Sequence, residues 1–121
     1  MKLLIVDDSE IIREAIENWL EPFGFEVIGR AGNGSRAIEM FSEKKPDIVT
    51  LDITMPEMDG LTAMEKMLTI NPGVKIIIIS ALAAKEVAIS AIKKGASSYL
   101  VKPFTRDELE EVMKETLEDR S

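Results

Sequence analysis

Five short, largely apolar runs recur along the chain, and longer amphipathic stretches separate them. The runs cover residues 3–6, 25–28, 48–51, 76–79 and 98–101. Because they show little polar alternation, they predict strands that are covered on both faces rather than strands with one face in water. The run at 76–79, four isoleucines in a row, is the most β-prone of the five and predicts the central strand of the sheet, fourth along the chain.

Each run is followed by a stretch with helical periodicity and recognisable ends. Ser9 offers an N-cap to the first predicted helix, which Pro22 and Gly24 stop. The fourth helix is expected over residues 84–94, before Gly95, and the last opens with the capping box Thr105-x-x-Glu108. The predicted buried stripe of the fourth helix is Ala84, Val87, Ala88 and Ala91.

The alternation of strand and helix occurs five times, which predicts an α/β fold. Right-handed crossovers between successive parallel strands place helices on both faces, so we expect a doubly wound parallel sheet. A chain of 121 residues has the size of one domain, and we expect residues 1–121 to form a single one.

Polar residues follow four of the five predicted strands at the edge where ligands bind in open α/β sheets. They are Asp7 and Asp8, Asp52, Ser80 and Lys102. Three carboxylates in one pocket repel one another, and a divalent cation would relieve that repulsion. Oxygen ligands favour Mg²⁺, with Mn²⁺ as a second choice. Lys102 and Ser80 add a positive charge and a hydroxyl group, which suits a phosphoryl group beside the metal.

Composition narrows the chemistry further. The net charge of −7 and the pI near 4.7 argue against direct nucleic-acid binding. The chain has no cysteine and no histidine, so it offers neither a thiolate zinc site nor an imidazole base. No apolar run approaches the ~20 residues of a membrane span, and Asp7 and Asp8 interrupt the N-terminal apolar stretch. We therefore expect a cytoplasmic protein without membrane contact.

Four stretches taken together resemble the receiver domain of two-component response regulators. They are residues 5–9 (IVDDS), 52–60 (DITMPEMDG), 80–81 (SA) and 102–104 (KPF). The resemblance covers essentially the whole chain and implies a flavodoxin-like sheet with strand order 2-1-3-4-5. The stretch 52–58 is similar to chemotaxis regulators, whereas the residues after Ala81 lack the Met-Gly-Gln-Gln run of many of them. A stand-alone regulator is expected, and a receiver cut from a longer protein stays open.

The resemblance implies a role for each residue of the pocket. Asp52 would accept a phosphoryl group from the phosphohistidine of a sensor kinase or histidine phosphotransferase, and Lys102 would contact the phosphoryl oxygens. Asp8 would bind Mg²⁺ directly and Asp7 largely through water. Asp52 and the backbone carbonyl of Thr54 would complete the protein ligands. The domain would then be a phosphoacceptor module, not an enzyme, with at most slow hydrolysis of its own acyl phosphate.

The resemblance also implies a switch and two partner surfaces. Ser80 would turn toward the phosphoryl group and Tyr99 would follow it inward, although an edge-strand tyrosine with its hydroxyl in water is an ordinary alternative. A downstream protein target would bind the fourth helix, fifth strand and fifth helix, where Ile89 lies off the buried stripe. Ile11 and Trp19 would face the kinase, and a core role for Trp19 is an equal alternative. The Lys102–Pro103 bond would be cis.

The main competing function is a phosphatase of small phosphate esters with an aspartate nucleophile. Such enzymes typically carry Asp-x-Asp, in which the second aspartate is the acid and base, whereas Thr54 occupies that position here. A receiver-like module that is never phosphorylated would have lost acidic residues or the lysine, and none is lost. A flavin-binding domain would need a phosphate loop rich in Gly, Ser and Thr after the first strand, which is absent.

Overall fold

The computed structural model describes residues 1–54 and 60–118. Residues 55–59, within the family-like stretch 52–60, and residues 119–121 of the expected domain lie outside the described residues. The elements, in chain order, are β1 Lys2–Val6, α1 Glu10–Leu20, the 3₁₀ helix η1 Glu21–Phe23, β2 Glu26–Ala31, α2 Gly34–Lys44, β3 Ile48–Leu51, α3 Gly60–Ile70, β4 Lys75–Ser80, α4 Lys85–Lys93, β5 Ser98–Val101 and α5 Arg106–Glu118.

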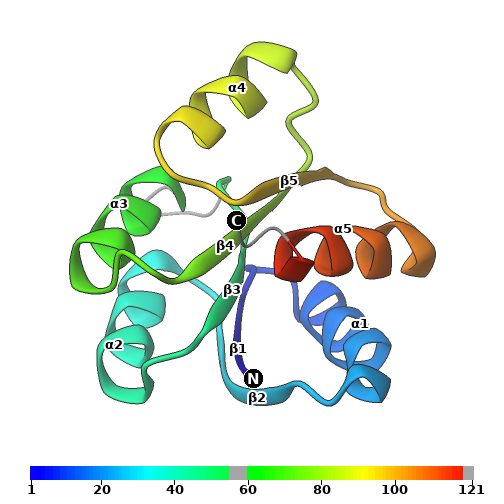
Figure 1. The fold of residues 1–121 in the computed structure, drawn as a ribbon, viewed down its shortest axis with the longest axis horizontal. Coiled ribbons are helices and arrows are strands. Elements are labelled where there is room, and N and C mark those ends of the chain that lie inside the picture. Colours follow the sequence, from blue (N-terminus) through cyan, green and yellow to red (C-terminus); the bar gives the residue numbers. More distant parts are fainter. Residues whose placement is uncertain (55–59, 119–121) are drawn as a thin grey trace.

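The five strands form one parallel sheet in the order β2-β1-β3-β4-β5. Helices α1 and α5 cover one face, and α2, α3 and α4 cover the other (Figure 1). The predicted fold class and strand order are therefore confirmed. The fourth strand lies inside the sheet, where β4 pairs with β3 on one side and β5 on the other, but the middle strand is β3 and not β4 as predicted.

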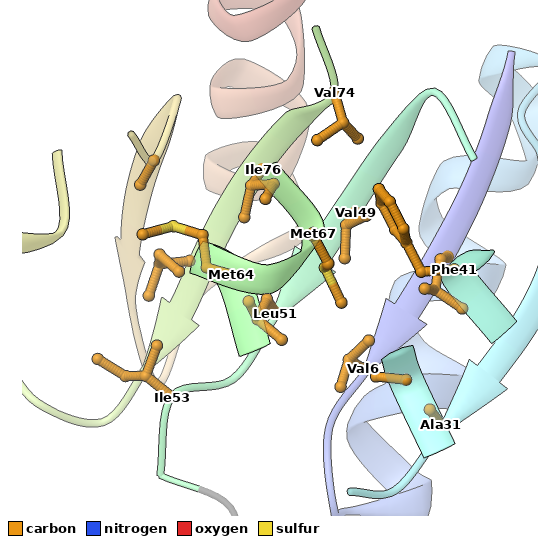
Figure 2. Close-up of a cluster of buried hydrophobic side chains, with 14 of the residues drawn as sticks. Val6, Ala31, Phe41, Val49, Leu51, Ile53, Met64, Met67, Val74 and Ile76 are labelled. Atoms are coloured by element: carbon orange, nitrogen blue, oxygen red, sulfur yellow. The ribbon is translucent and has the colours of Figure 1, made fainter. Parts of the chain in front are cut away.

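Two apolar clusters hold the layers together, one on each face of the sheet. Figure 2 shows the larger, in which Phe41 of α2 and Met64 and Met67 of α3 pack on Val49 and Leu51 of β3. The other joins Ile16 of α1 and Leu109 and Met113 of α5 to the opposite face. Burial of each such side chain stabilises the fold by about 1.5–3 kcal/mol. The clusters thus fix the strands whose ends carry the polar residues.

Local sequence signals explain where most helices begin and end. The Ser9 hydroxyl accepts a hydrogen bond from the Ile12 amide, as an N-cap does. The Thr105 amide donates to Glu108 Oε1 at 2.8 Å, and the Glu108 amide donates to Thr105 Oγ1 at 3.1 Å. The predicted N-cap and capping box are confirmed. Gly24 follows η1 with a φ of 81°, which glycine adopts without strain.

The structure corrects two details of the predicted elements. The second strand runs to Ala31 rather than ending at residue 28, because Gly29 and Ala31 continue the pairing with β1. Ala84 is exposed at the N-cap of α4, whereas Ala91 is the buried residue of that helix. An alanine carries too little apolar surface for its exposure to cost much, so the stripe pattern overestimated its burial.

Candidate functional site

Backbone hydrogen bonds extend the sheet by one residue beyond three of its strands and so place the polar side chains. The Asp7 amide donates to the Ala31 carbonyl, and the Asp52 amide donates to the Val6 carbonyl, each at 3.0 Å. The Lys102 amide donates to the Ser80 carbonyl at 2.8 Å. Because these residues continue the ladder, their positions are as well defined as those of the strands.

Three carboxylates converge at this edge. Asp7, Asp8 and Asp52 each offer one oxygen, and these oxygens lie within 4.8 Å of one another. Asp7 and Asp52 are buried, with 1% and 2% exposure, whereas Asp8 is exposed. The cluster is therefore open to solvent on the side of Asp8.

Lys102 supplies the positive charge that the two buried carboxylates require. Its Nζ lies 2.8 Å from Asp7 Oδ2 and 3.3 Å from Asp52 Oδ2, and its side chain is 19% exposed. Burial alone would favour neutral forms, and the ion pair opposes that effect. One lysine between two carboxylates leaves net negative charge, which a divalent cation can balance.

The pKa values of this group reflect both effects. Burial raises the pKa of Asp7, although the Lys102 ammonium group and the hydrogen bond from the Ser9 amide act in the opposite direction. Burial lowers the pKa of Lys102, but the Asp7 carboxylate and then Asp52 more than compensate, so the pKa is raised overall. Lys102 therefore stays positive at neutral pH, whereas ionisation of the buried Asp7 carboxyl group costs folding free energy.

Asp52 is held in one orientation by Thr54. The Thr54 amide donates to Asp52 Oδ1 at 2.9 Å, and the Thr54 hydroxyl donates to the same oxygen at 2.8 Å. The other carboxylate oxygen, Oδ2, faces Lys102. One oxygen of Asp52 is thus fixed by the loop, and the second is directed into the pocket.

The residues present fit a divalent cation with hard oxygen ligands. Asp7 Oδ2 is buried and has no donor in hydrogen-bond geometry, so that its partner within the described residues is the Lys102 charge alone. Carboxylate oxygens at this spacing suit Mg²⁺ or Mn²⁺. The expected contribution of the Thr54 backbone carbonyl stays a prediction.

Ser80 and Tyr99 meet at Leu82. The buried Ser80 hydroxyl accepts a hydrogen bond from the Leu82 amide at 3.0 Å. The Tyr99 hydroxyl donates to the Leu82 carbonyl at 2.6 Å. Tyr99 is half-buried and packs against the apolar cluster of Figure 2. One peptide segment therefore links the edge of the sheet to the surface strand β5, a link that sequence alone did not predict.

The residues predicted to face partners differ in their exposure. Ile11 is 78% exposed and Ile89 is 47% exposed, as their off-stripe positions indicate. Ile92, which the pattern did not single out, is equally prominent on α4. Trp19 is half-buried, with its ring 6.0 Å from that of Phe104 in an edge-on arrangement. A shallow groove of about 350 Å³ lies here, lined by Ile12, Ala15, Trp19, Ala81, Lys102, Pro103 and Phe104.

Two further features of the site region have clear geometry. The Lys102–Pro103 peptide bond is cis, as the resemblance implied. Arg13 of α1, which sequence reasoning missed, donates from Nη1 to the Asp7 backbone carbonyl at 2.5 Å. Arg13 lies four residues after the N-cap Ser9, a position that does not by itself indicate this contact.

Comparison with known proteins decides the family. A family model described as response regulator receiver domain matches residues 3–114. The chain belongs to this family. The resemblance drawn from four short stretches is therefore confirmed over almost the whole length of the chain.

The receiver domain has close relatives among chemotaxis regulators. It is 47% identical over 113 residues to the chemotaxis protein CheY of Listeria monocytogenes, covering 93% of this chain and 95% of that protein. CheY of Bacillus subtilis is 44% identical over 116 residues, covering 96% and 97%. A CheX–CheY–BeF₃–Mg²⁺ complex from Borrelia burgdorferi contains a chain of TM-score 0.93 and 32% identity, covering 97% of this receiver domain and 89% of that chain.

The family sets the general role of this receiver domain. Receiver domains are signalling modules, mainly non-enzymatic, that work with phosphotransfer partners and downstream targets and bind Mg²⁺ at an acidic cluster. Among the residues described here, none of the helices has the length and apolar character needed to cross a membrane.

Proposed function

We propose that Asp52 of this receiver accepts a phosphoryl group from a phosphohistidine on a sensor kinase or histidine phosphotransferase. The observation that carries the proposal is the convergence of Asp7, Asp8 and Asp52 around the ammonium group of Lys102. The chain has no histidine of its own, so the phosphohistidine belongs to the partner.

Asp52 Oδ2 is the proposed nucleophile. This oxygen forms the new P–O bond while the P–N bond of the donor breaks, and the electron pair leaves with the imidazole nitrogen, which is protonated by solvent. An ionised carboxylate needs no general base, in keeping with a chain that has no histidine. Lys102 stabilises the charge on the phosphoryl oxygens, and Thr54 holds Oδ1 so that Oδ2 stays directed at the donor.

The cation site is the second part of the proposal. Asp8 would bind Mg²⁺ or Mn²⁺ directly and Asp7 largely through water, with Asp52 and the Thr54 carbonyl as further ligands. When bound, the metal neutralises charge on the transferring phosphoryl group. The same pocket would hydrolyse the acyl phosphate slowly, because the chain has no histidine that could activate water.

Phosphorylation would act on partner binding through Leu82. A phosphoryl group on Asp52 offers new acceptors to the Ser80 hydroxyl, which would then release the Leu82 amide. Loss of that bond would free the segment that also accepts from Tyr99. Tyr99 would turn inward and change the surface of α4, β5 and α5, where Ile89 is exposed. The downstream protein target would bind there.

The remaining proposals concern the surface that faces the kinase, the location of the protein and the class of its targets. Ile11 and the groove beside Trp19 would contact the partner kinase or phosphotransferase, since Ile11 is exposed on α1 and Lys102 lines the groove. Residues 1–121 would act as one receiver in the cytoplasm. The net charge of −7 supports protein targets rather than direct nucleic-acid binding.

Intact mass spectrometry tests the acceptor. The protein is incubated with Mg²⁺ and acetyl phosphate or phosphoramidate, and we expect the mass of one phosphoryl group to be added and to be lost in base. Asp52→Asn should show no adduct. Asp47→Asn is the matched control, because Asp47 is exposed at the opposite end of β3 and an asparagine oxygen can still accept from the Lys2 amide. An adduct that persists in Asp52→Asn would place the acceptor elsewhere.

The same samples separate the phosphatase alternative. The Thr54 hydroxyl donates a hydrogen bond to Asp52 Oδ1, and Thr54 provides no carboxylic acid at the position where such phosphatases carry their second aspartate. We therefore expect one adduct and no sustained turnover of p-nitrophenyl phosphate. Continuous release of nitrophenol that depends on Asp52 would favour the phosphatase instead.

Two variants test the switch. Ser80→Ala removes the acceptor of the Leu82 amide, and Tyr99→Phe removes the donor to the Leu82 carbonyl. Both should still be phosphorylated, but the phosphorylation-induced amide chemical-shift changes in α4 and β5 should shrink. Shift changes as large as those of the unmodified sequence would show that the signal takes another route.

A further inference from the structure

A hydrogen bond from the Arg13 side chain ties α1 to the acidic edge. Its guanidinium Nη1 donates to the backbone carbonyl of Asp7 at 2.5 Å, and the side chain is half-buried. The same nitrogen lies against Gly32, where an added Cβ would approach it to 3.3 Å. Within the described part of the chain, no carboxylate forms an ion pair with Arg13.

This bond completes the fixation of Asp7. The Asp7 amide is held by the Ala31 carbonyl at 3.0 Å, and its Oδ1 is held by the Ser9 amide at 2.9 Å. Arg13 holds the remaining backbone group, the carbonyl. That carbonyl belongs to the peptide unit that leads to Asp8, so its direction sets the plane from which Asp8 projects.

Asp8 depends on that peptide plane more than the other two carboxylates do. Asp7 and Asp52 are buried and paired with Lys102. Asp8 is exposed, and among the described residues its side chain has no hydrogen bond or ion pair. Its oxygen nevertheless lies within 4.8 Å of the other two. The backbone is therefore what brings Asp8 to the cluster.

We infer that Arg13 is a positioning residue, which fixes the Asp7–Asp8 peptide so that the Asp8 carboxylate converges with Asp7 and Asp52 on a divalent cation. The inference rests on the proposed cation site and assigns Arg13 no contact with the metal or the phosphoryl group. A charge-assisted bond to a carbonyl is among the stronger hydrogen bonds in proteins, which suits this role.

A positioning role and a purely electrostatic role of Arg13 predict opposite changes in Mg²⁺ affinity when Arg13 is replaced. A guanidinium beside an anionic site repels a cation, so its removal would then tighten Mg²⁺ binding. Positioning predicts weaker binding, because the ligand set would no longer be preorganised. The sign of the change in affinity thus separates the two explanations.

The test is a Mg²⁺ titration of the unphosphorylated protein, followed by amide chemical shifts and by the fluorescence of Trp19, the only tryptophan. Arg13→Met keeps the apolar stem and removes the donors. We expect its Mg²⁺ affinity to fall about tenfold, as for other groups that orient metal ligands. Arg36→Met is the matched control, because it removes an exposed cation paired with Glu39, and its affinity should stay within about twofold of the parent.

Arg13→Lys retains one donor and the charge, so its affinity should lie between those of the parent and Arg13→Met. A cooperative urea unfolding transition shows that each variant is folded. If Arg13→Met is not folded, the test is made with Arg13→Lys alone. Unchanged or tighter binding in a folded Arg13→Met, or in the lysine variant when it stands alone, would overturn the inference. Absence of Mg²⁺ binding in the parent would instead refute the proposed cation site, and the inference with it.

Discussion

The ammonium nitrogen of Lys102 lies 2.8 Å from Oδ2 of Asp7, a side chain that is 1% exposed. The two residues come from the opposite ends of the chain and from strands that do not pair with each other, β1 and β5. Their ion pair spans the edge of the sheet above β3 and β4. A divalent cation and Lys102 would therefore share the same carboxylates, and each would reduce the attraction of the site for the other.

This sharing predicts that removal of the lysine charge strengthens cation binding. In Lys102→Met the carboxylates lose their positive neighbour, so we expect Mg²⁺ affinity to rise roughly tenfold, allowing for solvent screening. Phosphorylation by acetyl phosphate should become slower, because the phosphoryl charge is less stabilised. Amide chemical shifts and intact mass measure the two effects. Lys114→Met, which alters an exposed lysine on α5, should change neither, and weaker Mg²⁺ binding in Lys102→Met would contradict the shared-site geometry.

The burial of Asp7 predicts a stability cost at neutral pH. Its pKa in the folded protein is raised above the ordinary value of 3.8, chiefly by burial. Stability linked to this group is therefore complete below that value and is lost as pH rises through the folded pKa. Asp7→Asn mimics the protonated form, so without divalent cations it should unfold at higher urea concentration than the parent at neutral pH.

The advantage of Asp7→Asn should shrink as pH falls toward the ordinary carboxyl range. Added Mg²⁺ should stabilise the parent more than the variant, because the variant has lost a cation ligand. Asp47→Asn, at the other end of β3, should show neither effect. An Asp7→Asn protein less stable than the parent at neutral pH, with EDTA present, would show that the Lys102 pair outweighs the cost of burial.

The Glu17–Arg30 pair joins α1 to the edge strand β2. Arg30 Nε donates to Glu17 Oε1 at 2.6 Å, and the hydrogen bond from Arg30, which outweighs burial, lowers the Glu17 pKa from 4.5. Stability from this pair is present above that value and is lost as pH falls through the folded pKa. Because both side chains are partly exposed, Glu17→Gln should cost only about 0.5 kcal/mol of unfolding free energy.

Urea unfolding at neutral and acidic pH, with and without salt, measures this contribution. The loss in Glu17→Gln should diminish at acidic pH and at high salt. Glu14→Gln removes an exposed carboxylate of the same helix and should cost less. Equal losses in the two variants would mean that the bridge adds nothing beyond ordinary surface charge.

Gly60 allows α3 to begin directly against the loop that carries Asp52. An added Cβ would lie 2.4 Å from the Asp52 carbonyl oxygen and 2.4 Å from the Ile53 Cα. These are backbone atoms that cannot move without shifting Asp52, so Gly60→Ala should destabilise the fold by about 2 kcal/mol and slow phosphorylation. Gly73→Ala, whose nearest neighbour would be 3.5 Å away, is the control in urea unfolding. A fully stable and active Gly60→Ala would show that the loop can shift to make room for the added methyl group without displacing Asp52.

The strand ends were predictable because a short apolar run closed by a charged residue has one simple structural explanation. Asp7, Asp52 and Lys102 follow such runs and meet at one edge, as the parallel arrangement requires. The helix caps at Ser9 and Thr105 were predictable for the same reason, since they depend on residues within one turn. Chemistry at element boundaries is local, and the sequence specifies it.

What the sequence determined by itself is therefore the order of the elements and the set of polar residues that leave the strands. Tertiary structure alone decided that Lys102 pairs more closely with Asp7 than with Asp52, that Arg13 holds the Asp7 carbonyl, and that Leu82 links Ser80 to Tyr99. These contacts join residues on different elements. Their partners depend on how the helices pack across the sheet, a relationship that periodicity along a single chain does not contain.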